Sequence, residues 1–145
     1  MNVRAKDLTK EAPGSPKEKL GGYVCLPRMI DKCRAMINGT NGEFNFNCPL
    51  DKRLLEFKNI DAEEFKKYVS EGRSDEEILE WFNINGDFKT DEEIEKWSNQ
   101  ADRKDYATRE DKKKWFIPYC EKLGLDPFKT SLFDYLDADD KASSS

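Results

Sequence analysis

One pattern occurs three times between residues 61 and 97, and it constrains the fold more than any other feature of the chain. It begins with a capping residue (Asp, Ser or Thr), continues with two glutamates and an apolar residue, and ends three positions later with an aromatic residue. The copies occupy 61–68, 74–81 and 90–97. A capping side chain followed three residues later by glutamate marks the start of a helix. The pattern therefore predicts three short amphipathic helices, whose acidic first turns complement the helix dipole.

Further helices are predicted on both sides of this region. One is expected over residues 27–37 and another from Pro49, because each begins with a proline, which suits the first position of a helix. A longer helix is expected within 108–124, where Pro118 should kink or divide it. A last short helical element is expected over 126–136. The chain is thus predicted to be mainly helical, with about five to seven short helices.

The remaining segments predict little regular structure. Residues 1–20 contain turn-forming proline and glycine and read as an irregular arm, while 138–145 read as a flexible acidic and Ser-rich tail. Residues 43–47 alternate between polar and aromatic side chains, which is typical of a short extended piece. We therefore expect one compact domain over 1–145, a helical bundle with at most one short strand pair.

Composition limits the partners that this chain can have. Aromatic residues make up 12% of it and charged residues 38%, which predicts a thin aromatic core under a charged exterior. The net charge is −5, whereas nucleic-acid binders carry a positive excess, so no nucleic-acid partner is expected. The sequence has no run of roughly 20 apolar residues that would cross a bilayer, and no secretory leader is recognisable. We expect a cytoplasmic protein, without a membrane partner, that binds a protein or a small molecule.

The chain contains no histidine. This excludes Ser-His-Asp and Cys-His catalysis, as well as zinc sites that use histidine ligands. The four cysteines contain no closely spaced pair of the kind that structural zinc requires. No metal and no cofactor are therefore expected.

Cys48 is the candidate residue for chemistry. It directly precedes Pro49 at a predicted helix start, where free N–H groups and the helix dipole stabilise a thiolate. The alternative is a buried, inert thiol beside Phe44 and Phe46, since free cysteine is among the most buried residue types.

A second candidate is an anion site at the start of the helix predicted over 27–37. Gly21, Gly22 and Tyr23 precede this helix, and the helix itself carries Arg28 and Lys32. Backbone N–H groups at a helix N-terminus favour phosphate or carboxylate. The same glycines equally explain a simple bend in the chain, so both readings stay open.

Several phrases of the sequence together resemble a known family. They are Asp7-Leu8-Thr9, Leu20-Gly21-Gly22-Tyr23, Leu26-Pro27-Arg28-Met29-Ile30-Asp31-Lys32, Cys48-Pro49-Leu50-Asp51, Ser74-Asp75-Glu76-Glu77, Glu93-Ile94-Glu95-Lys96-Trp97 and Phe133-Asp134-Tyr135-Leu136-Asp137. The chain resembles the bacterial family catalogued as domain of unknown function 5069. The resemblance spans nearly the whole chain and so implies a single domain, but it implies no activity, cofactor or catalytic residue.

Two functions follow as hypotheses. The absence of histidine and of any catalytic motif favours a small cytoplasmic binding or adaptor module without catalysis. The alternative is a small cysteine-dependent enzyme or redox-sensitive protein, in which Cys48 acts on an anionic small molecule.

Overall fold

Short helices dominate the part of the chain that the structure, a computed structural model, describes, residues 3–144. The elements follow one another as β1 (Lys19–Leu20), β2 (Tyr23–Val24), α1 (Leu26–Asn38), α2 (Pro49–Lys58), α3 (Ala62–Val69), α4 (Asp75–Ile84), α5 (Asp91–Ala101), α6 (Lys113–Lys122) and α7 (Leu132–Ser144). The strands form one antiparallel pair. The predicted mainly helical fold, with about five to seven short helices and at most one short strand pair, is confirmed.

The repeated capping pattern does what the sequence predicts. Ser74 and Thr90 begin α4 and α5 with complete capping boxes. In each box the capping side chain accepts a hydrogen bond from the backbone N–H of Glu77 or Glu93, and the carboxylate of that glutamate accepts one from the backbone N–H of the capping residue. Asp61 caps α3 through its side chain. Each box satisfies N–H groups that would otherwise lack a partner, so these helix starts are determined locally.

The strand pair forms at residues 19–24 and not at 43–47, where the structure has turns. Gly21 (φ 59°) and Gly22 (φ 86°) both adopt left-handed backbone, which closes a two-residue hairpin with the twist that its strands need. The hydroxyl of Ser98, in α5, accepts from Val24 N–H (3.3 Å) and donates to the Gly22 carbonyl (2.8 Å). The hairpin is thereby attached to α5.

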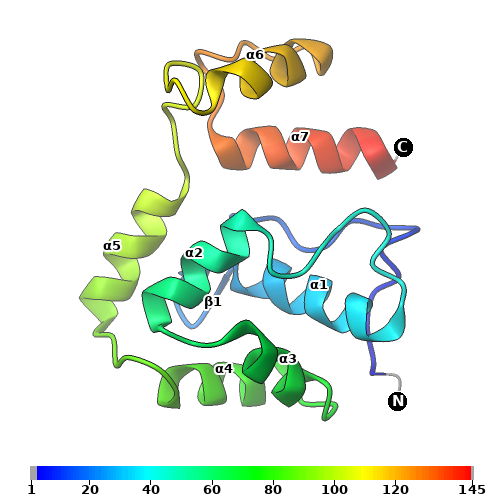
Figure 1. The fold of residues 1–145 in the computed structure, drawn as a ribbon, viewed down its shortest axis with the longest axis vertical. Helices are drawn as coiled ribbons and strands as arrows, with labels where there is room; N and C mark the ends of the chain where they lie inside the picture. Colours follow the sequence, from blue (N-terminus) through cyan, green and yellow to red (C-terminus); the bar gives the residue numbers. More distant parts are fainter. Residues whose placement is uncertain (1–2, 145) are drawn as a thin grey trace.

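Two clusters of apolar side chains make up the interior. The larger lies among the hairpin and helices α1–α5 and includes Tyr23 and Phe82. The smaller lies around α6 and α7 and includes Phe116 and Phe133. In Figure 1, α6 and α7 stack together above α1–α4, and α5 runs alongside. Trp97 of α5 packs against both clusters and so connects them.

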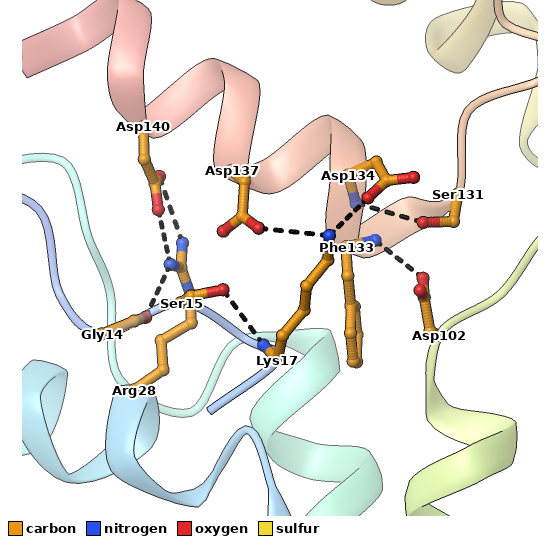
Figure 2. A network of polar contacts seen from close by, with 10 residues as sticks. All are labelled: Gly14, Ser15, Lys17, Arg28, Asp102, Ser131, Phe133, Asp134, Asp137 and Asp140. Carbon is orange, nitrogen blue, oxygen red and sulfur yellow. Dashed lines mark hydrogen bonds and ion pairs between the residues drawn. The ribbon is translucent and has the colours of Figure 1, made fainter. Parts of the chain in front are cut away.

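A polar network fastens α7 to the rest of the molecule (Figure 2). Lys17, from the N-terminal arm, approaches Asp134 (2.5 Å) and Asp137 (3.7 Å) on α7. At the start of the helix, the carboxylate of Asp102 accepts from Phe133 N–H at 2.9 Å. These contacts join segments that lie far apart in the sequence.

Residues 138–144, within the segment 138–145 for which the sequence predicts a flexible tail, are helical in the structure. Helix α7 continues through Ser144, and residue 145 lies outside the described residues. The physical reason is Arg28, whose buried guanidinium binds both oxygens of Asp140, with Nη1–Oδ2 at 2.6 Å and Nη2–Oδ1 at 3.3 Å (Figure 2). A charge-assisted pair of this kind holds the last turns against the body of the fold.

Candidate functional site

Cys48 lies at the N-terminal end of α2, as the sequence predicts, and it has a charged neighbour. The ammonium of Lys32, in α1, donates to Cys48 Sγ at 3.1 Å. The same Nζ lies 2.9 Å from Asp51 Oδ2. Lys32 and Asp51 are buried, whereas Cys48 is half-buried. Three polar groups from two helices therefore meet at the start of α2.

Local backbone structure brings these groups together. Asn47 adopts left-handed backbone (φ 66°), and its N–H donates to Asp51 Oδ2 at 3.0 Å. Cys48 follows in extended conformation, and Pro49 then takes the first helical position. Because Asp51 is the third residue of α2, its carboxylate both closes this turn and receives Lys32.

The surroundings of Cys48 differ from those of the other cysteines. Burial raises the pKa of Cys25 and of Cys33 to about 12, and it also raises the pKa of Cys120. All three are buried among apolar side chains. A thiol beside a cation at a helix N-terminus is the environment in which cysteine reacts as a nucleophile.

The residues predicted for an anion site do not gather at one place. Arg28 is engaged by Asp140 and by the Gly14 carbonyl (3.2 Å), under α7 (Figure 2). Lys32 is engaged at Cys48 and Asp51. Both cations thus have structural partners. Gly21, Gly22 and Tyr23 form the hairpin turn and its second strand, and no hydrogen bond or ion pair among the described residues joins them to Arg28 or Lys32.

Tyr23 instead borders a cavity of about 410 Å³, formed by the hairpin, the end of α2 and the connection from α4 to α5. Lys58, Phe88, Lys89 and Ile94 also line it. The hydroxyl of Tyr23 is buried and has no hydrogen-bond partner within residues 3–144. Burial, reinforced by the charge of Glu93, raises the pKa of Tyr23 to about 12, so the hydroxyl remains a neutral donor. A buried hydrogen-bond donor without an acceptor costs free energy of folding, so the unpaired Tyr23 hydroxyl marks a place where a ligand acceptor would be favourable.

Lys58 was not predicted as a site residue. Its Nζ donates to the backbone carbonyls of Asp87 (2.6 Å) and Asn83 (3.4 Å), and burial lowers its pKa. One signal was present in the sequence: Lys58 stands four residues after Leu54, at a position where the apolar repeat of α2 expects a buried side chain.

The outer rim of this cavity exposes apolar surface. Phe88, which lines the cavity, is 81% exposed, and Ile84, four residues earlier in the chain, is 74% exposed. Between them, Gly86 lies so close to α2 that an added Cβ would fall 1.9 Å from the Lys58 carbonyl oxygen. This contact fixes the course of the connection that forms the cavity wall.

No group of three or more Cys, Asp or Glu side chains within 3–144 is placed to hold a metal ion. No helix in that range combines the length and the apolar character that a bilayer crossing needs.

Comparison with known families then identifies the chain. Residues 10–142 match the family model described as domain of unknown function, DUF5069. The chain belongs to the DUF5069 family. Two of the phrases that carry the DUF5069 resemblance, 26–32 and 48–51, meet in space where Lys32 contacts Cys48 and Asp51. A search of curated proteins found no match.

Proposed function

We propose that this protein is a small helical binding module that holds a ligand in the cavity beside Tyr23 and carries out no chemistry on it. The observation that supports the proposal is the buried Tyr23 hydroxyl, which has no partner among the described residues. The cavity is partly open to solvent and is lined by both polar and apolar side chains, so a ligand there would find hydrogen-bond partners as well as apolar contact surface. A ligand atom that accepts this hydrogen bond would remove the cost of the unpaired donor.

Native mass spectrometry of protein purified gently from its own host tests this proposal. We expect the purified protein to retain a small molecule. When this molecule is removed and then added back, the NMR resonances of residues 21–23, 58 and 88–94 should shift. Resonances of Lys32 and Cys48 serve as internal controls, because they belong to the other candidate site. Shifts confined to these controls, or no response to a metabolite extract of the host, would contradict the proposal.

A second candidate function is favoured by the 3.1 Å contact between Lys32 Nζ and Cys48 Sγ. In this alternative, Cys48 acts as a nucleophile or a redox-sensitive thiol toward an anionic small molecule. Alkylation by iodoacetamide over pH 6–9 tests it, with Cys48→Ser as the background and Lys32→Gln as the variant that removes the cation. Reaction of Cys48 at the rate of a cysteine in the unfolded chain would reject this candidate.

The proposal includes a cytoplasmic location. The four cysteines, which are all free thiols, support it, because reducing compartments keep thiols unpaired. Fractionation of the host, followed by thiol counting on the isolated protein, tests it. Recovery from an oxidising compartment would contradict it.

A further inference from the structure

We propose that the cavity beside Tyr23 binds a small carboxylate carried on an apolar body, with the carboxylate held between the Tyr23 hydroxyl and the Lys58 ammonium. This inference rests on the proposed binding function, because it names the chemical class of ligand for the same cavity. It commits to a ligand with one negative group and an aromatic or aliphatic remainder.

The first support is the incomplete pairing of Lys58. The side chain is buried, with the whole residue 1% exposed. An ammonium has three N–H donors, and the described chain supplies acceptors for two of them, the Asp87 and Asn83 carbonyls. No ion pair among residues 3–144 includes Lys58. A buried charge needs a counter-charge, and the C-terminal end of α4 supplies only a partial one.

The second support is the position of Tyr23 beside Lys58. Its ring packs edge-on against Phe82, with centroids 5.1 Å apart, and Lys58 Nζ lies 5.8 Å from the centroid of the same Phe82 ring. Tyr23 and Lys58 both line the cavity and both contact the Phe82 ring, so the two residues belong to the same stretch of its wall. A neutral hydroxyl and an ammonium both donate, and a carboxylate accepts from both.

The charges of the other lining residues favour a ligand with a single negative charge. Lys89 lies over the Phe57 ring at 4.5 Å and is in no ion pair of the described chain, while Asp91 supplies one exposed acid. Lys58 and Lys89 against Asp91 leave the lining with a single positive charge, and Asp87 and Glu93 lie nearby. With these two acids the surroundings carry a net charge of −1, which disfavours a doubly charged phosphate and leaves the Lys58 ammonium as the group that favours a single carboxylate. The exposed ring of Phe88 offers apolar surface to the rest of the ligand.

A larger hollow of about 660 Å³ lies beside Arg34 and Arg73, but its chemistry differs. Arg34 pairs with Asp75 at 2.6 Å, and Arg73 pairs with Glu71 at 2.9 Å. Arg73 Nε is buried without a hydrogen-bond partner among the described residues, but both guanidinium groups are already paired with carboxylates, so the hollow has less need of an anion than the cavity beside Tyr23.

The test uses four probes that separate charge from shape: benzoate, benzamide, benzylammonium and inorganic phosphate. Each is titrated into the full-length protein and followed by NMR. We expect benzoate to shift residues 21–23, 58 and 88–94 and to bind at least about tenfold more tightly than benzamide, since a hydrogen bond to a charged group is worth that much. Benzylammonium and phosphate should bind more weakly than benzoate.

Three variants separate effects on ligand binding from effects on folding. Tyr23→Phe should weaken benzoate binding by about tenfold without loss of stability, because the hydroxyl has no partner in the free protein. Lys58→Met should abolish the preference for benzoate over benzamide. Lys52→Met is the matched control, since this lysine lies on the same helix but is exposed, and it should leave both affinities unchanged.

The outcomes distinguish this inference from the proposed function. Equal binding of benzoate and benzamide at the cavity residues would overturn the carboxylate inference while keeping the cavity as a ligand site. Tighter binding of phosphate than of benzoate would also overturn it. If none of the four probes shifts these residues, the carboxylate inference is overturned, and the metabolite-extract experiment then decides the binding function separately.

Discussion

Arg28 and Asp140 lie 112 residues apart in the sequence, yet they form a buried ion pair with Nη1 and Oδ2 2.6 Å apart. The guanidinium comes from α1, in the larger apolar cluster, and the carboxylate comes from α7, beside the smaller one. This pair therefore joins the two halves of the interior. It also explains why a cation that the sequence suggests for anion binding is engaged within the fold.

Replacing Asp140 by Asn should destabilise the protein by about 3–5 kcal/mol, because Arg28 keeps its buried charge and loses its counter-charge. Urea denaturation measures the change. The control is Asp137→Asn on the same helix, whose partner Lys17 is half-exposed and 3.7 Å away. That variant should lose less than about 1 kcal/mol. Equal effects of the two substitutions would show that the Arg28 pair does not hold α7.

Replacing Lys32 by Met should also cost about 3–5 kcal/mol, because Asp51 is buried and keeps an uncompensated charge. The double variant Lys32→Met with Asp51→Leu removes both charges and should recover most of the loss. Denaturation of the single and double variants gives the coupling energy. Additive losses would mean that the two residues do not interact in solution.

Stability should fall at high pH through the buried tyrosines. Burial raises the pKa of Tyr23 and of Tyr135 to about 12, against about 10 in an unfolded chain. Because the pKa is higher in the folded state, the stabilisation that comes from keeping each tyrosine neutral is complete below pH 10 and is lost as the pH rises toward 12. Each tyrosine then lowers the free energy of unfolding by up to about 1.4 kcal/mol per pH unit. Urea denaturation from pH 8 to 11 measures this slope. Tyr23→Phe should make it shallower above pH 10, and an unchanged slope would contradict the burial of that hydroxyl.

Two glycines with similar backbone should respond differently to alanine. Gly86 (φ 68°) and Gly39 (φ 74°) both adopt left-handed backbone, but an added Cβ meets the Lys58 carbonyl only at Gly86. Gly39→Ala should cost about 1 kcal/mol for backbone strain alone. Gly86→Ala should cost about 3 kcal/mol or more, because the hydrogen bond from Asp87 N–H to the Lys58 carbonyl is lost as well. Thermal or urea unfolding compares them, and equal costs would contradict the close approach.

Much of the helical pattern could be predicted because its causes are local. Ser74 and Thr90 cap helices with glutamates three residues away, and Pro49 occupies a first helical position without any distant contact. The position of Cys48 at a helix N-terminus follows from the same local logic. The position of the strand pair was not predicted, because the alternation at 43–47 looks extended, whereas pairing depended on the two glycines at 21–22.

The amino-acid sequence by itself determined the helical class of this protein, most of its helix starts, the lack of imidazole chemistry and the place of Cys48, because these depend on residues within one turn of each other. Only the tertiary structure decided the partners. It set Lys32 against Cys48, Arg28 against Asp140, and Tyr23 and Lys58 around one cavity. Such pairings follow from how distant helices pack, and charged side chains have no sequence period that identifies which distant group they will meet.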